Sequence, residues 1–198
     1  DRFNSVIKGR QTHGSRPWGG VDPIVAAADV IGSAQTIVSR RQNISKLPVG
    51  ATFGASKGGI RYNIIPDQVE MIGTIRTFDE GMRAAVFKDL QNVAEHVAAA
   101  HGATAIVQIP DTKGNPVTVN DPALSAKMRP SLVSAVGADN VIDMDLTMGA
   151  EDFSFYAREV PGFFFFVGAT PKGQDALKAP SSQSPEVESR RYQLRSFL

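Results

Sequence analysis

The stretch VEMIGTIRTFDEGMRAAVFKDLQNVAEHVAAAH, residues 69–101, decides the fold because its hydrophobic period changes in the middle. Its first part alternates with period two, as a half-buried strand does, at Val69, Met71, Gly73, Ile75 and Thr77. Asp79 then predicts a helix start. Apolar side chains follow at helical spacing, at Met82, Val86, Leu90, Val93, Val97 and Ala100. The stretch therefore predicts a strand and a long amphipathic helix, which Gly102 ends.

Three more strands and one more helix surround this stretch within the first 110 residues. The expected elements are strands at 3–8, 49–55 and 104–109 and a helix from Asp22 to about Asn43. Asp22 is a favourable N-cap, and Pro23 fits the first helical position because its missing N–H would be unpaired there anyway. The resulting order, β-α-β-β-α-β, is the split pattern of a ferredoxin-like sandwich. We therefore predict an α+β domain with two helices on one face of an antiparallel sheet.

A second unit is expected after a polar, turn-rich connection at residues 110–116. Its expected elements are a helix at 121–137, bent near Pro130, a strand at 141–142, a helix at 151–159 and a strand at 163–167. The last of these strands is expected to expose an apolar surface, so that it is either covered by a partner chain or less ordered than the first domain. Residues 186–198 show no clear period, and we expect this tail to be poorly ordered. The predicted domains are 1–112 and 113–198.

Composition excludes several classes of protein before any motif is considered. The 198 residues include 21 basic and 20 acidic side chains, so the net charge of +1 gives no argument for nucleic-acid binding. Cysteine is absent, which excludes disulfides, thiolate zinc sites and thiol nucleophiles. No apolar run approaches the roughly 18 residues of a membrane helix, so we expect a soluble chain. The first residue is not Met, and the N-terminal residues lack a signal-peptide pattern, so we interpret the sequence as part of a longer chain.

Ser56 lies in the segment GASKG at 54–58, which matches the G-x-S-x-G pattern of α/β-hydrolases. That pattern requires a helix directly after the serine, and residues 59–66 are unsuited to form one. We therefore interpret the segment as a glycine-rich turn between strands. A serine hydrolase is the alternative, and labelling by a serine-reactive probe would reveal it.

The remaining candidates for metal ligation are two histidines and an acidic cluster. His96 and His101 are five residues apart, about 140° around a helix, so they cannot face one metal together. We expect His96 on the surface and His101 beside the helix C-terminus. Carboxylates offer oxygen ligands for Mg²⁺ or Ca²⁺, although caps and solvated loops explain them equally well, at Asp143, Asp145, Glu151 and Asp152. We assign no metal ligand in this chain.

His13 differs from the other histidines because it follows the first strand in a loop of glycine and polar residues, QTHGSRPWGG at 11–20. Loops held by a rigid scaffold are where binding and catalytic residues gather. The residues alone leave two roles open for His13, that of a functional hydrogen-bond donor and that of a structural one.

Four parts of the chain carry a recognisable pattern. They are HGSRPW with VDPI at 13–24, YNIIPD at 62–67, GTIRTF at 73–78 and MGAEDFSFY at 148–156. Together they closely resemble zinc-dependent amidohydrolases of the aminoacylase/carboxypeptidase family, in the branch of hippurate hydrolase, N-acyl amino acid amidohydrolases and auxin-conjugate hydrolases. The likeness runs in family order from residue 1 to about 185 and covers about the second half of a family chain.

The resemblance implies a ferredoxin-like lid and dimerisation domain at 1–112, followed at 113–198 by an incomplete α/β segment of a catalytic domain. It implies that His13 donates a hydrogen bond to the scissile carbonyl oxygen of a substrate in the partner subunit. It also implies that Asn63 and Arg76 hold the substrate carboxylate. Gln183 stands where the family has its last metal-binding histidine, and an amide is a poor zinc ligand.

The resemblance further implies a fragment of a metal-dependent amidohydrolase that hydrolyses N-acyl amino acids or related amides. A divalent metal, either zinc, manganese or cobalt, is expected in the full-length parent, whereas this chain should hold none and be inactive alone. The expected partner is a second copy, bound through the lid, with neither nucleic acid nor membrane. The alternative is a non-catalytic module for dimerisation or for binding a small molecule. The compartment stays open, with the cytoplasm favoured.

Overall fold

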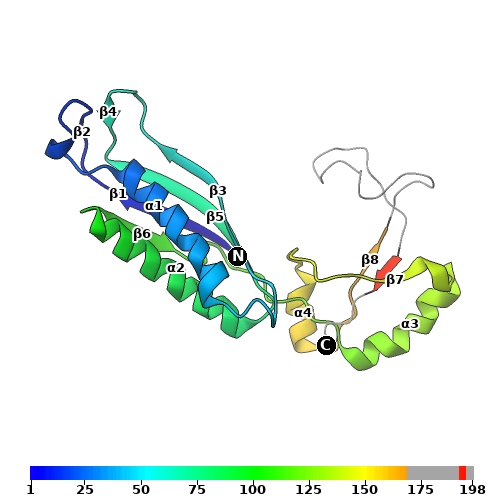
Figure 1. Cartoon of the computed structure of the whole chain (residues 1–198). Coiled ribbons are helices and arrows are strands. Elements are labelled where there is room, and N and C mark those ends of the chain that lie inside the picture. The colour runs from blue at the N-terminus through cyan, green and yellow to red at the C-terminus, as the bar shows by residue number, and fades with distance from the viewer. Residues whose placement is uncertain (169–191, 195–198) are drawn as a thin grey trace. The chain divides into compact units, whose positions relative to one another are not determined.

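The computed structural model describes residues 1–168 and 192–194 (Figure 1). Both helices and strands form in this part of the chain, which confirms the predicted α+β class. The chain divides into two compact units, Asp1–Val117 and Thr118–Leu198. No helix in the described ranges combines the length and apolarity needed to cross a bilayer. Gln183 and most of the predicted disordered tail lie outside the described residues.

The first unit contains a four-stranded antiparallel sheet in the order β3-β5-β1-β6. Its strands are β1 (Arg2–Lys8), β3 (Gly50–Gly58), β5 (Gln68–Arg76) and β6 (Thr104–Gln108). Two helices, α1 (Pro23–Thr36) and α2 (Glu80–Ala100), pack on one face of this sheet (Figure 1). A turn of π-helix at Ile37–Arg41 extends α1 toward its predicted end.

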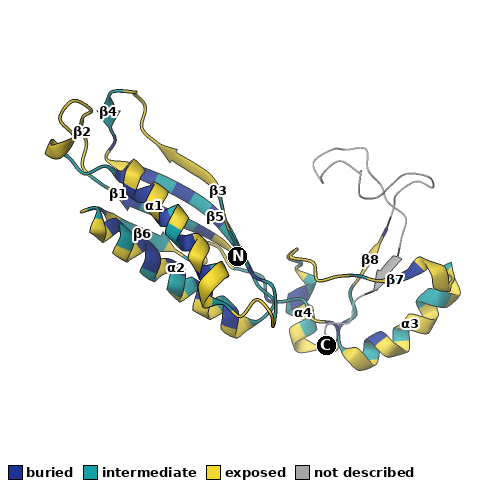
Figure 2. Ribbon diagram, in the orientation of Figure 1, coloured by how far each residue is buried: buried dark blue, intermediate teal, exposed yellow. Residues whose placement is uncertain are grey.

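Burial alternates along the central strands β1 and β5 (Figure 2). Phe3 and Ile7 are fully buried, whereas Asn4 and Val6 between them are only half-buried. Because successive side chains of a strand point to opposite faces, one face meets the helices and the other stays open. The core between sheet and helices includes Phe3, Ile7, Val30, Ile37, Val69, Met71, Ile75, Val86 and Leu90.

Both long helices begin at the predicted capping residues. Oδ1 of Asp22 accepts hydrogen bonds from the backbone N–H of Ile24 at 2.8 Å and of Val25 at 3.4 Å. Oδ1 of Asp79 accepts one from the N–H of Met82 at 2.7 Å. These carboxylates satisfy N–H groups that have no partner within the first turn of a helix. The predicted starts of α1 and α2 are therefore confirmed.

Strand β3 is longer than predicted. It continues past Ala55 to Gly58, and the turn begins only at Gly59, whose φ is +76°. A bulge between Phe53 and Ala55 absorbs a shift in register, after which pairing with β5 resumes. Main-chain hydrogen bonding to β5 thus outweighs the weak strand preference of the glycines, so the prediction of a glycine-rich turn at residues 54–58 is wrong.

A two-stranded sheet forms outside the main one, in segments predicted as loop and turn. It pairs β2 (Thr12–His13) with β4 (Ile64–Ile65) in antiparallel register. A short 3₁₀ turn, Pro17–Gly19, follows β2. Strands of two residues are too short to show a period, which is why the sequence did not predict them.

The second unit combines helices with a three-stranded sheet in the order β7-β9-β8. Its elements are α3 (Pro122–Val136), a 3₁₀ turn (Ala138–Asn140), β7 (Val141–Asp143), α4 (Phe153–Glu159), β8 (Phe165–Val167) and β9 (Tyr192–Leu194). β9 is parallel to β7 and antiparallel to β8. It lies in the tail where no element was predicted, because its three residues pair through the backbone and carry no pattern.

Asn120 joins the start of α3 to the segment that leads into β8. Its amide nitrogen donates to the Phe164 carbonyl at 2.8 Å, and its Oδ1 accepts from the Phe164 N–H at 2.7 Å. The side chain, 1% exposed, therefore imitates a neighbouring strand. In contrast, β8 leaves apolar side chains partly open, as expected from the sequence, at Phe165, Phe166 and Val167.

Gly73 is the tightest point of the main sheet, and its replacement tests the packing described above. A Cβ at Gly73 would collide with the ring of Phe3 and the carbonyl oxygen of Thr52. Gly73→Ala should therefore lower the free energy of unfolding by about 1–3 kcal/mol, measured by urea denaturation. The control is Gly54→Ala, because the nearest atom to its Cβ would lie at 3.9 Å and its φ is not positive. Equal destabilisation by both changes would contradict this account.

Candidate functional site

The β2–β4 pair brings His13 and Asn63 together from positions fifty residues apart in the sequence. His13 pairs with Ile64 across the two strands, and the Gly14 N–H donates to the Asn63 carbonyl at 2.8 Å. The side chains then approach each other, with Asn63 Nδ2 at 3.5 Å from His13 Nε2. A tertiary contact thus unites two of the three residues to which the resemblance assigned roles.

Ser15 and Asn63 contact opposite nitrogens of the His13 ring. The Ser15 backbone N–H donates to His13 Nδ1 at 3.1 Å, and the Ser15 hydroxyl lies 2.7 Å from the same nitrogen. The amide nitrogen of Asn63 faces the other ring nitrogen, Nε2, at 3.5 Å. In the sequence, the contact with Ser15 is indicated by a serine two residues after the histidine in a glycine-containing turn, and the role of this serine was not predicted.

This arrangement places an imidazole beside a primary amide at the surface. His13 and Ser15 are exposed, and Asn63 is half-buried beside them. An imidazole N–H next to a primary amide can bind a carbonyl or carboxylate oxygen, because both groups offer N–H donors. A donor aimed at an oxygen that gains negative charge is the usual means of stabilising it.

Arg76 lies at the opposite end of the sheet from this pair. The strand register places Gln68 beside Lys8, close to β2, and Arg76 beside Gly50. β5 has nine residues, so its ends are about 27 Å apart at 3.4 Å per residue. Within one chain, the structure therefore does not bring Arg76 to His13 or Asn63.

The surroundings of Arg76 also separate it from the carboxylates near it in sequence. Asp79 caps α2, and Glu70 accepts a hydrogen bond from Asn4 at 3.0 Å. In the described ranges Arg76 forms no ion pair with either of them. Burial lowers the pKa of the α-ammonium group of Asp1, and the positive charge of Arg76 lowers it further.

Ser56 is part of a strand, so the structure does not form a nucleophile elbow around it. It lies in β3, exposed, and pairs with Met71 of β5. No helix follows, since the chain turns at Gly59 and enters β4. This agrees with rejecting a serine hydrolase, although the segment is strand rather than the predicted turn.

The two histidines of α2 point to different partners. His96 Nδ1 lies 2.7 Å from the Asn92 carbonyl oxygen, so this nitrogen donates to it, and the ring is exposed as predicted. His101 is the C-cap of α2, as predicted, and its Nε2 also lies 2.8 Å from Asp29 Oδ2 of α1. Asp143, from the acidic cluster, is paired with Arg129 at 2.7 Å.

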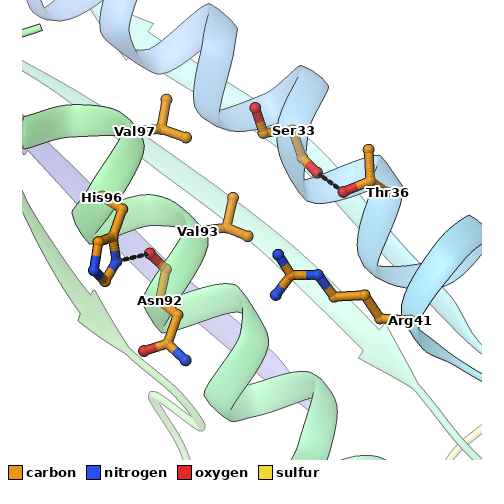
Figure 3. A pocket seen from close by; sticks show the side chains of 7 residues that line it. All are labelled: Ser33, Thr36, Arg41, Asn92, Val93, His96 and Val97. Atoms are coloured by element: carbon orange, nitrogen blue, oxygen red, sulfur yellow. Dashed lines mark hydrogen bonds between the residues drawn. The ribbon is translucent and has the colours of Figure 1, made fainter. Parts of the chain in front are cut away.

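A groove runs between α1 and α2 and contains none of the three predicted site residues. Figure 3 shows side chains from both helices along it, with the Arg41 guanidinium reaching between them. Arg41 also pairs with Asp89 at 3.0 Å. The groove is lined by Ser33, Thr36, Arg41, Asn92, Val93, His96 and Val97.

Residues 1–102, which contain both helices and three of the four strands of the main sheet, match the family of the peptidase dimerisation domain. The chain belongs to the M20 peptidase dimerisation domain family. The resemblance to amidohydrolases seen in the sequence is therefore confirmed at the level of the family. The matched range contains His13, Asn63 and Arg76.

Named relatives of this M20 chain are hydrolases. It is 36% identical to an N-acetylcysteine deacetylase of Bacillus subtilis, over 85% of this chain and 43% of that protein. It is 34% identical to the IAA-amino acid hydrolase ILR1-like 4 of Arabidopsis thaliana, over 93% of this chain and 42% of that protein. The chain thus spans less than half the length of the curated relatives that it matches.

A solved structure supports the same family. The YXEP protein of Bacillus subtilis, described as a dinuclear metal binding peptidase from the M20 family, is 32% identical. It matches with a TM-score of 0.60 over 82% of this chain and 38% of its own. In residues 1–168 and 192–194 of the present chain, no three His, Asp or Glu side chains gather as a metal site requires. The described residues therefore do not fit a dinuclear centre.

His13 is exposed and Asn63 only half-buried, which predicts that this pair contributes little to stability. Asn63→Ala should change the free energy of unfolding by less than about 0.5 kcal/mol. The same substitution at Asn120, which has two hydrogen bonds to Phe164, should cost about 1–3 kcal/mol because it leaves buried backbone groups unpaired. Hydrogen exchange, with the protection of each unit measured separately, determines the effect of both substitutions. A large loss of protection in Asn63→Ala would assign Asn63 a structural role.

Proposed function

We propose that this chain is the C-terminal portion of a metal-dependent amidohydrolase that cleaves N-acyl amino acids or related amides. In this proposal residues 1–112 form a ferredoxin-like lid and dimerisation domain, and residues 113–198 belong to the catalytic domain. The sheet order β3-β5-β1-β6 with two helices on one face supports the first assignment. The hydrolase names of the relatives, and the share of their length that matches, support the second.

The lid joins two copies in a homodimer, and the edge strand β3 is the surface that favours this. β3 has nine residues, one side of which pairs with β5. Its other side is the edge of the sheet in the described part of the chain. Residues 54–58 of β3 are exposed and include a single charge, on Lys57. A long edge strand with few charges is a template for pairing with a second strand.

The proposal of a site shared between two subunits rests on the distance between Arg76 and the His13–Asn63 pair. A small amide substrate cannot span about 27 Å, the length of β5. The three side chains can therefore serve one substrate only if they come from different subunits. One subunit supplies His13 and Asn63, and the other supplies Arg76 together with its own catalytic domain.

Within this site the described residues bind and orient the substrate. An imidazole N–H of His13 donates to the carbonyl oxygen of the amide and stabilises the negative charge that develops there. The side-chain amide of Asn63 lies beside the His13 ring and adds a second N–H donor close to the substrate carboxylate. The Arg76 guanidinium holds that carboxylate through its fork of N–H groups. Since the described residues do not fit a metal centre, no step of hydrolysis through a metal is assigned to them.

The proposal predicts how this chain behaves by itself. It should sediment as a dimer, retain less than one tightly bound metal ion per chain, and hydrolyse no N-acyl amino acid. The first result follows from the exposed β3 edge, and the others from the absence of a metal-binding group among the described residues. Analytical ultracentrifugation, elemental analysis and an acylase assay measure the three. If the chain alone bound a metal ion stoichiometrically or hydrolysed an N-acyl amino acid, the proposal that the metal chemistry belongs to another segment of the protein would be overturned.

Complementation between subunits tests the shared site. The chain is extended by the N-terminal half of the Bacillus subtilis N-acetylcysteine deacetylase and carries Gln183→His. His13→Ala and Arg76→Ala should each lower kcat by about 10²–10³-fold in homodimers, as loss of an oxyanion donor does. A heterodimer of these two variants retains one intact site, so about half of the original activity should return.

The matched control mixes His13→Ala with Asn63→Ala. Both residues come from the same subunit in this proposal, so every site in that heterodimer lacks one of them and activity should stay low. Recovery in this control, or none with Arg76→Ala in verified heterodimers, would refute the division between subunits. A non-catalytic dimerisation module, the alternative function, would show no turnover in any of these proteins.

A further inference from the structure

The end of the first unit that carries His13 also carries large apolar side chains in full contact with solvent. We name residues 10–18 and 57–62 the basic tip; the β2–β4 pairing and the Gly14–Asn63 hydrogen bond hold its two segments together (Figure 1). Trp18 is 80% exposed, Ile60 97% and Tyr62 102%. Such exposure of three large side chains at one place is unusual for a surface that meets only water.

The basic tip is strongly cationic. Its segments contain four Lys or Arg side chains and neither Asp nor Glu, and the cations are Arg10, Arg16, Lys57 and Arg61. All four are exposed, and none forms an ion pair with a described carboxylate. Since the whole chain carries a net charge of +1, this concentration of positive charge must be balanced elsewhere.

The combination of residues is that of a protein-binding hot spot. Trp, Tyr and Arg are enriched among the residues that contribute most to interfaces, whereas Lys and Glu dominate ordinary surfaces. Trp18, Tyr62, Arg16 and Arg61 stand on the two turns on either side of the His13–Asn63 pair. The residues that surround the proposed substrate contact thus resemble a docking surface.

The second unit offers the complementary surface. We name residues 138–160 the acidic segment, because it contains six carboxylates and one cation, Arg158. The carboxylates are Asp139, Asp143, Asp145, Glu151, Asp152 and Glu159. It also exposes apolar side chains that could meet those of the basic tip, at Leu146, Met148, Tyr156 and Val160. Opposite charges steer and orient two surfaces during association.

We propose that the basic tip of one copy docks on the acidic segment of a second copy of this chain. The inference rests on the proposed function, in which His13 of the tip serves the partner's site. It extends that function by naming the surface that positions His13: Arg16 and Arg61 pair with carboxylates of the acidic segment. Trp18 and Tyr62 are buried against its apolar side chains.

The test places a photo-crosslinking residue at the tip, as Tyr62→p-benzoylphenylalanine, and mixes this chain with an isotope-labelled, unsubstituted copy. Irradiation should join residue 62 to residues 138–160 of the labelled copy, as identified by mass spectrometry. Arg16→Glu with Arg61→Glu should lower this yield about tenfold, because like charges then face each other. Glu151→Lys with Glu159→Lys in the labelled copy should restore it.

The control carries the same photo-crosslinking residue at Ile44, which is 57% exposed and lies outside the basic tip. It should give no product with residues 138–160. Cross-links confined to one copy, or to other residues, would overturn the docking. If ultracentrifugation shows a dimer but the cross-link is absent, the proposed docking of the basic tip is wrong, whereas the proposed homodimer is retained. A monomeric chain would overturn both.

Discussion

The contact between Phe3 of β1 and Gly73 of β5 is the constraint on which the first unit depends. Phe3 is fully buried, and its ring lies where the side chain of any larger residue at position 73 would be. The ring also meets Phe53 of β3 edge-on, with centroids 5.1 Å apart. Three neighbouring strands are thus held in one register. A shift by one residue would turn the buried face of β1 toward solvent, so the register is strongly specified.

That register determines where the functional side chains lie. Pairing Phe3 with Gly73 also pairs Lys8 with Gln68, so the segments that follow β1 and precede β5 leave the sheet at the same end. They form the β2–β4 pair there, and His13 meets Asn63. The same register carries Arg76 to the far end of β5. A rigid sheet therefore sets both the contact within one pair and the distance to the third residue, and this distance supports the proposal of a site shared between subunits.

The two units differ in how their backbone groups are satisfied and in the surfaces that they leave open. The first unit has a closed core between sheet and helices, and its open surfaces are the sheet face, the β3 edge and the basic tip. The second has short strands, and the Asn120 side chain supplies hydrogen bonds that a strand would otherwise provide. Its described residues expose the phenylalanines of β8 and many carboxylates. Such unequal surfaces are what a subunit needs in order to bind other protein segments in a defined orientation.

The sequence by itself determined the long elements, the caps at Asp22 and Asp79, and the family, because periodicity and capping act over neighbouring residues. It also selected His13, Asn63 and Arg76 as candidates, but only through resemblance. The tertiary structure alone decided that Ser15 forms a hydrogen bond with His13 Nδ1, and that two short strands join His13 to Asn63 and leave Arg76 at the other end of the sheet. These features arise from backbone hydrogen bonds between distant segments. Such bonds are made by groups that every non-proline residue carries, so they leave no pattern in the order of side chains.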